Sequence, residues 1–94
     1  MERAYRAKRG SLPRRVRLGC RVTLLERESM EQIALVVTRP ADSDPERGRI
    51  SCLSPLGRGL IGAEPGDVVD VALNNLSSRF YVLHVDPAPD KEAL

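Results

Sequence analysis

The stretch 50–71, ISCLSPLGRGLIGAEPGDVVDV, constrains the fold more than any other part of this chain. Ser54 can cap a helix, because its hydroxyl can accept a hydrogen bond from an amide of the first turn. Pro55 suits the first helical position, where its missing donor costs nothing. Gly62 can adopt the left-handed conformation that ends a helix, and EPGD at 64–67 has the composition of a turn. The stretch therefore predicts a strand, a short helix, a turn and a second strand.

Apolar patterns predict the remaining strands. The segment 20–27 has one apolar face, and 32–38 contains the run IALVV. The short polar connection between these two segments favours antiparallel pairing. Further strands are expected at 49–53, 67–73 and 79–86. Together they predict an α+β fold, with a twisted antiparallel sheet of about five strands packed on one short helix. Alternation along the last strand assigns its residues to two sides: Phe80, Val82 and His84 to one, and Tyr81, Leu83 and Val85 to the other.

Two glycines inside the predicted helix need a reason. Gly57 and Gly59 each cost about 0.8–1.0 kcal/mol relative to alanine, so we expect a close approach by another backbone, from the sheet or from a partner. With Gly62 they match the dinucleotide-binding pattern G-x-G-x-x-G, but no βαβ unit surrounds them, and we reject that interpretation. The segment 39–48, RPADSDPERG, predicts an acidic irregular loop that lacks the context of a calcium site.

Charge is distributed unevenly along the chain. Residues 1–21 carry eight basic groups and one acidic group, whereas the remainder carries seven basic and twelve acidic groups, for a net charge of +2. We therefore expect a basic N-terminal arm at 1–15, a domain at 16–87 and a frayed tail at 88–94. The arm can serve only to keep the protein soluble, or it can bind nucleic acid through phosphate contacts. The candidate nucleic-acid residues are Arg3, Arg6, Lys8, Arg9, Arg14 and Arg15.

Several function classes find no support in the composition. No apolar run approaches the roughly 20 residues of a membrane span, and no secretory signal is present, so we expect a cytoplasmic protein without a membrane partner. Cys20 and Cys52 are too few for a disulfide scaffold, and we expect Cys52 to be buried in its strand. His84 is the only histidine, and no nucleophile or ligand cluster has a recognisable setting. We expect no catalytic residue, no cofactor and no metal, and hence no enzyme.

Four ordered blocks carry a family resemblance: RIS at 49–51, SPLG at 54–57, LIG at 60–62 and GDVV at 66–69. Together they resemble the C-terminal domain of the bacterial GreA/GreB transcription elongation factors and of their relative Rnk, the regulator of nucleoside diphosphate kinase. The segment PADSD at 40–44, which precedes the first block and is followed by GRIS at 48–51, resembles Rnk most closely. The resemblance implies an FKBP-like fold and RNA polymerase as the partner.

The resemblance also implies that two separate domains carry catalysis and docking. In Gre factors an N-terminal coiled coil enters the secondary channel of the polymerase with the acids that hold a catalytic magnesium ion, while the C-terminal domain docks on the channel rim. The 15 residues before Val16 are too few for that coiled coil. We therefore expect a non-catalytic regulator that binds RNA polymerase near the rim. The alternatives are a small nucleic-acid-binding module that uses the basic arm, and a Rnk-like regulator of a metabolic enzyme.

The docking turn of the family reads Asp/Asn-Ser-Pro. In this chain Ser54 and Pro55 match it, and Leu53 stands where the acid or amide would be. The resemblance thus implies a partner-binding patch of Leu53, Ser54, Pro55 and the nearby Arg58.

Overall fold

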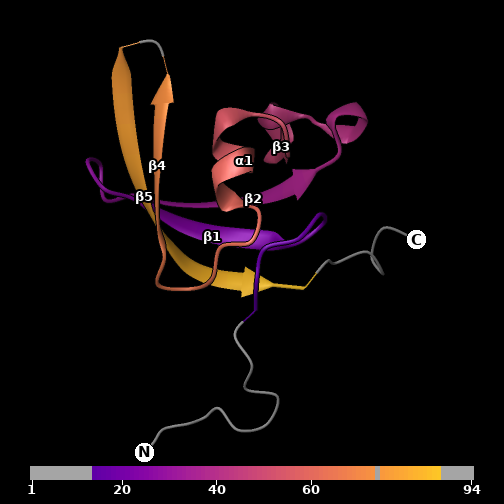
Figure 1. Ribbon diagram of the computed structural model, residues 1–94, viewed down its shortest axis with the longest axis horizontal. Helices are drawn as coiled ribbons and strands as arrows, with labels where there is room; N and C mark the ends of the chain where they lie inside the picture. The colour runs from indigo at the N-terminus through magenta and orange to yellow at the C-terminus, as the bar shows by residue number, and fades with distance from the viewer. Residues whose placement is uncertain (1–13, 74, 88–94) are drawn as a thin grey trace, which may run out of the picture.

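A computed structural model describes residues 14–73 and 75–87 (Figure 1). Five strands form one sheet in the order β3-β2-β1-β5-β4. The sheet curls, and the one α-helix of the described residues lies in its hollow (Figure 1). No helix among the described residues is long and apolar enough to cross a membrane. The elements, in chain order, are β1 (Arg21–Glu26), β2 (Gln32–Thr38), the 3-10 helices η2 (Pro40–Asp42) and η3 (Pro45–Arg47), β3 (Arg49–Ser51), α1 (Pro55–Leu60), β4 (Val68–Leu73) and β5 (Leu76–Asp86).

The predicted fold class is confirmed, and one strand pairing differs from the prediction. β3 runs parallel to β2, with Val36 opposite Arg49 and Thr38 opposite Ser51, so the sheet is mixed. The cause is the loop 39–48, which folds into two short 3-10 helices that each begin with a proline. These turns carry the chain back along β2, so that β3 starts level with the middle of β2 and runs in the same direction.

Two strand ends also differ from the prediction. β3 stops at Ser51, because Cys52 and Leu53 form the turn that leads into α1. Cys52 is therefore half-buried and not the buried strand residue that we expected. β5 begins at Leu76, since Ser77 and Ser78 continue the ladder with β4. Residues 76–78, which precede the strand predicted at 79–86, thus belong to β5, and Leu76 pairs with Leu73 of β4.

A β-bulge interrupts the alternation of β5. Thr23 of β1 pairs with His84, whereas the next residue, Leu24, pairs with Val82, so Leu83 is the extra residue. The bulge puts Val82 and Val85 on the same buried side, with exposed fractions of 1% and 5%. The prediction that they face opposite sides was wrong, because strict alternation does not survive an inserted residue.

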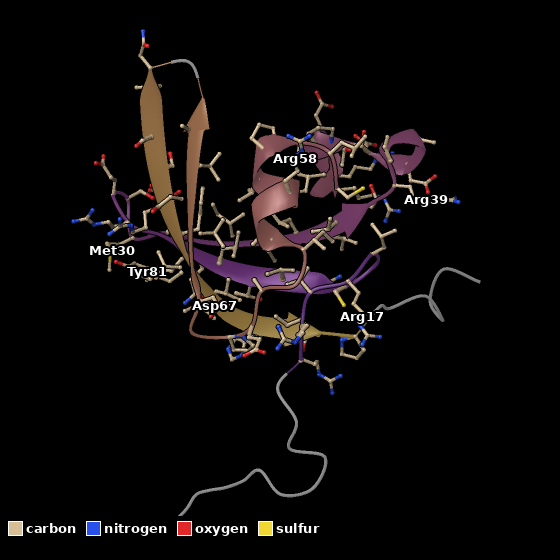
Figure 2. The ribbon with its side chains drawn as sticks, viewed as in Figure 1. Arg17, Met30, Arg39, Arg58, Asp67 and Tyr81 are labelled. Atoms are coloured by element: carbon tan, nitrogen blue, oxygen red, sulfur yellow. The ribbon has the colours of Figure 1, made fainter. Side chains whose placement is uncertain are left out.

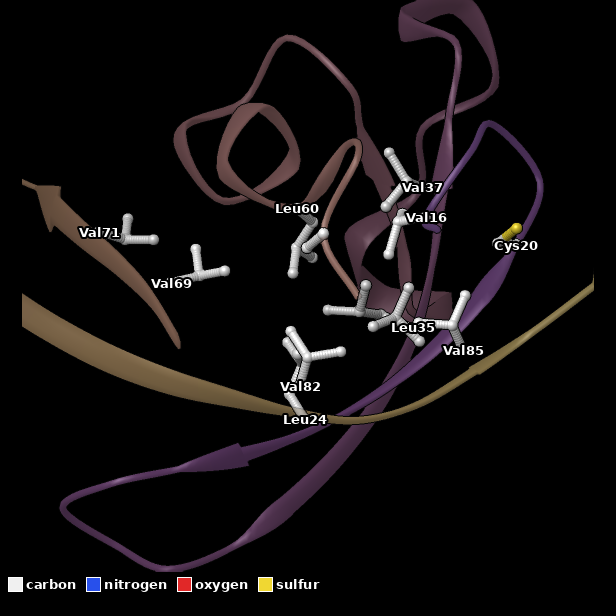
Figure 3. Packing of buried hydrophobic residues seen from close by; sticks show 12 residues of the cluster. Val16, Cys20, Leu24, Leu35, Val37, Leu60, Val69, Val71, Val82 and Val85 are labelled. Atoms are coloured by element: carbon white, nitrogen blue, oxygen red, sulfur yellow. The ribbon is translucent and has the colours of Figure 1, made fainter. Parts of the chain in front are cut away.

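The core is aliphatic and lies between α1 and the concave side of the sheet (Figure 3). Leu60 is its helical member and is completely buried. Val16, just before β1, joins the core and exchanges backbone hydrogen bonds of 2.9 Å with Gly62 and Ala63. The start of the described chain is therefore fastened to the end of α1. The buried cluster consists of Val16, Cys20, Val22, Leu24, Leu35, Val37, Leu60, Ala63, Val69, Val71, Val82 and Val85.

The two helical glycines are explained by close packing within the fold. A Cβ at Gly57 would overlap the carbonyl oxygen of Ser51, and one at Gly59 would lie 2.7 Å from Cγ1 of Val69. The helix therefore contacts the end of β3 on one side and β4 on the other. The expected approach of another backbone is confirmed at Gly57, where it comes from the sheet, whereas Gly59 is approached by a side chain.

Candidate functional site

The segment that leads into α1 is fixed by a network of short hydrogen bonds. The hydroxyl of Ser54 accepts from the amide of Gly57 at 3.0 Å and donates to the carbonyl oxygen of Ser51 at 2.7 Å. The hydroxyl of Ser51 in turn accepts from the amide of Leu53 at 3.0 Å. Ser54 is thus the helix cap that the sequence predicted. The network holds the backbone so that the side chain of Leu53 projects into solvent, with 63% of its surface exposed.

The four residues of the predicted patch lie together on this rigid turn. We call Leu53, Ser54, Pro55 and Arg58 the docking patch. The amide of Arg58 donates to the carbonyl oxygen of Ser54 at 2.8 Å, so Arg58 follows one helical turn after the cap. Leu53, Pro55 and Arg58 are exposed, whereas Ser54 is half-buried by its capping role. Three of the four side chains are therefore free to meet a partner.

Arg58 lies on the α1 side of the molecule, well away from the β1–β2 turn at Met30 (Figure 2). The ion pairs in the described part of the chain join Arg15 to Glu64, Arg39 to Asp42, Arg47 to Asp44, and Arg79 to Asp70, and none of them includes Arg58. Its guanidinium group is thus available for a carboxylate on another molecule.

An open apolar groove adjoins the docking patch, and the sequence did not reveal it. The groove has a volume of about 430 Å³ and is lined by Leu18, Cys52, Arg58 and Ile61. Leu18 is 48% exposed and Ile61 is 42% exposed, which is high for large apolar side chains that flank a complete core. Leu18 and Ile61 are far apart in the sequence. Only the tertiary approach of the turn before β1 to α1 makes them neighbours.

The basic arm lies largely outside the described residues, and so do its candidates Arg3, Arg6, Lys8 and Arg9. Arg14 and Arg15 are described, and both are exposed. The guanidinium group of Arg15 is engaged within the domain: it pairs with Glu64 at 2.8 Å and donates to the carbonyl oxygen of Gly62 at 3.2 Å. Binding of nucleic acid by this arm stays a prediction.

A second polar cluster lies on the β4–β5 hairpin. The guanidinium Nε of Arg79 donates to Asp70 at 2.8 Å across the two strands. This hydrogen bond lowers the pKa of Asp70 and raises that of Arg79. The pair borders a polar hollow of about 220 Å³ that includes Arg27, Ser77 and Ser78. Because the two charges neutralise each other, we assign the pair to the stability of the hairpin.

The described residues do not bring together the groups that a metal site needs. No three His, Cys, Asp or Glu side chains lie close enough within 14–73 and 75–87 to hold an ion. His84, the only histidine in the sequence, is exposed on β5. The arrangement at α1 offers an exposed apolar surface and one cation, which are features of a binding surface.

The sequence comparison identifies the family. A model described as "Transcription elongation factor, GreA/GreB, C-term" matches residues 12–87. The chain belongs to this family. GreA of Clostridium botulinum (strain Hall) is 34% identical over 73 residues, which are 78% of this chain and 46% of that protein. GreA of Lachnoclostridium phytofermentans is 31% identical over 70 residues, or 74% and 44%.

Solved structures of GreA/GreB relatives have the same fold. The GreA factor homolog Gfh1 of Thermus thermophilus matches with a TM-score of 0.70 and 28% identity, over 85% of this chain and 53% of that one. A GreA/GreB elongation factor of Nitrosomonas europaea matches with a TM-score of 0.63 and 25% identity, over 74% and 58%. The chain spans about half the length of these relatives. The similarity therefore concerns the GreA/GreB C-terminal domain and not the whole factor.

Proposed function

We propose that this GreA/GreB C-terminal domain binds RNA polymerase near the rim of the secondary channel and acts there as a non-catalytic regulator of transcription in the cytoplasm. The observation that carries the proposal is the rigid helix start within the family-matched region. It presents Leu53, Pro55 and Arg58 to solvent beside an apolar groove. Membership of the GreA/GreB family supports transcription as the process.

The exposed side chains support binding better than the cap does. Ser54 caps α1 whether or not a partner exists, so its presence has a structural explanation. Leu53 and Ile61 have no such explanation. Their side chains are 63% and 42% exposed and therefore contribute little to the core. Large exposed apolar patches mark interaction sites, and both side chains lie near the groove beside α1.

The non-catalytic part of the proposal rests on what the docking patch contains. Its exposed side chains are apolar or cationic, whereas the resemblance assigns transcript cleavage to acids that hold a magnesium ion on a coiled coil. In this proposal the GreA/GreB C-terminal domain provides attachment to the polymerase. It does not itself bring acids to the catalytic centre.

A retention experiment with purified polymerase tests the proposal. The double variant Leu53→Lys/Arg58→Glu changes two exposed side chains and leaves the Ser54 cap intact. Because it places a charge on the apolar part of the patch and reverses its cation, we expect immobilised variant to retain polymerase at least tenfold more weakly than the original chain.

The matched control makes the same two chemical changes elsewhere. Leu76→Lys/Arg27→Glu alters an exposed leucine of the β4–β5 hairpin and an exposed arginine of the β1–β2 turn. We expect this control to retain polymerase like the original chain. Equal retention by both double variants, or no retention by the original chain, contradicts the proposal.

A further inference from the structure

We propose that this domain also binds single-stranded RNA on the outer face of the sheet, which is the side away from α1. A base stacks there on the ring of Tyr81. The phosphates of the strand contact three exposed arginines, which are Arg14, Arg17 and Arg21. RNA binding on this face needs no polymerase, so it stands apart from the proposed function.

The first described residues carry basic side chains that have no acidic partner within the described part of the chain. Arg14, Arg17 and Arg21 are exposed, and none of them takes part in its ion pairs. Arg15, in contrast, is held by Glu64. The first 21 residues together carry eight basic groups and one acidic group. Charge of this density attracts a polyanion, and the phosphates of a nucleic acid match it.

A tight turn brings the basic segment to the outer face of the sheet. The amide of Cys20 donates to the carbonyl oxygen of Arg17 at 3.0 Å, which closes the turn directly before β1. Arg21 is the first residue of β1 and lies opposite Asp86 near the end of β5. Because Val22 is buried in the core, the side chain of Arg21 belongs to the outer face. The basic segment therefore reaches this face where β1 begins.

Tyr81 lies in a row of side chains that crosses the outer face. Its neighbours in the row are Val68 of β4 on one side and Leu25 of β1 on the other. Val68 is 50% exposed, and Tyr81 and Leu25 are half-buried. Figure 2 shows Tyr81 on the side of β5 that faces away from α1. The ring is thus supported by aliphatic side chains and keeps contact with solvent, as a ring that stacks on a base must.

A neighbouring cation positions the ring of Tyr81. The pKa of Arg79 is raised first by its hydrogen bond to Asp70 and to a smaller extent by the phenol of Tyr81. The guanidinium group of Arg79 is itself fixed, since its Nε donates to Asp70 at 2.8 Å. The phenol therefore lies beside a fixed group, and Tyr81 loses little side-chain freedom when a base stacks on it.

The spacing of the contacts suits a single strand. Arg21 and Leu25, the neighbour of Tyr81, are four positions apart on β1, which is about 13 Å at roughly 3.3 Å per residue. A strand of a few nucleotides that crosses this distance places a phosphate at Arg21 and a base at Tyr81. Bases inside a duplex remain paired and stacked on one another, so they offer no free face to the ring.

Neutral polar side chains near Tyr81 favour RNA over DNA. Thr23 lies opposite His84 on β5, and Gln32 lies opposite Leu25. Hydroxyl, imidazole and amide groups can form hydrogen bonds with the ribose 2′-hydroxyl group, which DNA lacks. The excess of basic over acidic groups in the first 21 residues favours a polyanion over a protein at this face.

Fluorescence anisotropy on the full chain is the first measurement. The probe is a labelled single-stranded RNA of about 12 nucleotides, because such sites span roughly 4–16 nucleotides. We expect saturable binding whose affinity falls as salt rises, since bound arginines displace counterions. Single-stranded DNA of the same sequence and the RNA duplex should each bind at least about fivefold more weakly. Equal binding of either one overturns the inference.

Charge reversal separates local contacts from the effect of net charge. Arg14→Glu/Arg17→Glu should weaken RNA binding at least about tenfold, because it removes two phosphate contacts and adds repulsion. The matched control is Arg39→Glu/Arg47→Glu, which changes the net charge equally in the 39–48 loop, where both arginines already have acidic partners. The control should weaken binding less than about threefold. Equal losses in the two double variants would mean attraction by net charge alone and overturn the site.

Substitution of Tyr81 tests the stacking contact. Tyr81→Leu keeps an apolar side chain in the row but removes the ring, and it should weaken RNA binding about tenfold. Tyr81→Phe keeps the ring and should bind RNA like the original chain. Circular dichroism of both variants checks that they fold. Undiminished binding by Tyr81→Leu contradicts the inference, and so does an equal loss in Tyr81→Phe.

Two outcomes distinguish RNA binding from the proposed function. Tyr81→Leu should retain polymerase like the original chain, because Tyr81 and the docking patch lie on different sides of the sheet. If the original chain shows no salt-dependent binding of the RNA probe, the inference is wrong, whereas retention of polymerase still supports the proposed function.

Discussion

Ser54 illustrates how much single residues reveal about this fold. Its hydroxyl both accepts from the amide of Gly57 and donates to the carbonyl of Ser51. The sequence predicted the capping bond, because a serine before a proline is typical of a helix start. It did not predict the bond to Ser51, which depends on how the preceding turn folds. The residue types thus predicted the helix start, and tertiary geometry determined the rigidity of the patch.

The helical glycines lead to a prediction at the same scale. Gly57→Ala should lower the free energy of unfolding by about 3 kcal/mol, because its Cβ would overlap the backbone oxygen of Ser51, which cannot move without distorting the turn. In Gly59→Ala the added methyl meets a side chain, Cγ1 of Val69, and alanine is the better helix former by about 1 kcal/mol. We expect a net change within about 1 kcal/mol.

Urea unfolding of the two variants beside the original chain measures this difference. The two substitutions are chemically identical and lie two residues apart on α1, so each is the control for the other. Equal losses of stability would mean that the contact with the Ser51 carbonyl does not constrain the helix.

At the scale of the elements, periodicity predicted which segments are strands but not how two of them are arranged. β3 is parallel to β2 because the loop 39–48 doubles back, and loop composition alone does not give that path. The bulge at Leu83 likewise has no sequence signal, since every residue from 80 to 85 suits a strand. Its effect is large, because one extra residue puts Val85 on the same buried side as Val82.

The hairpin of β4 and β5 leads to a prediction on pH. The hydrogen bond from Arg79 lowers the pKa of Asp70 in the folded state. A lowered pKa means that the carboxylate stabilises the fold above its unfolded pKa of roughly 3.9. This stabilisation is lost as the pH falls through the folded value. Asp70→Asn should therefore slightly lower the melting temperature at pH 7, and the difference from the original chain should vanish in strong acid.

Thermal unfolding across the acidic range is the measurement, with Asp86→Asn as the control. Asp86 lies opposite Arg21 at the other end of β5, and it takes part in none of the ion pairs within 14–73 and 75–87. Added salt should weaken the effect at Asp70, because the pair is exposed. A difference between Asp70→Asn and the original chain that persists below the folded pKa would contradict the assignment.

At the scale of the whole molecule, the leucine that is buried in the core differs from the leucine that we propose for binding. Leu60 is fully buried between α1 and the sheet, whereas Leu53 is 63% exposed. The sequence predicted the short helix that carries Leu60. It could not predict the groove, because Leu18, Cys52 and Ile61 become neighbours only after three separate segments pack together.

This separation can be measured with two leucine-to-alanine substitutions. Leu60→Ala should lower the free energy of unfolding by about 2–5 kcal/mol, a large part of the roughly 5–15 kcal/mol that stabilises a typical domain. Leu53→Ala should change it by less than about 0.5 kcal/mol while weakening the retention of polymerase. Guanidinium unfolding and the retention experiment together provide the test. A large loss of stability in Leu53→Ala would show that this side chain serves the fold.

The fastening of Val16 to the end of α1 has a mechanical consequence. Two backbone hydrogen bonds of 2.9 Å join Val16 to Gly62 and Ala63, one residue beyond the groove wall at Ile61. Val16 precedes the groove residue Leu18 by two positions, and Gly62 directly follows the groove residue Ile61. The two bonds therefore hold both walls of the groove at a fixed separation.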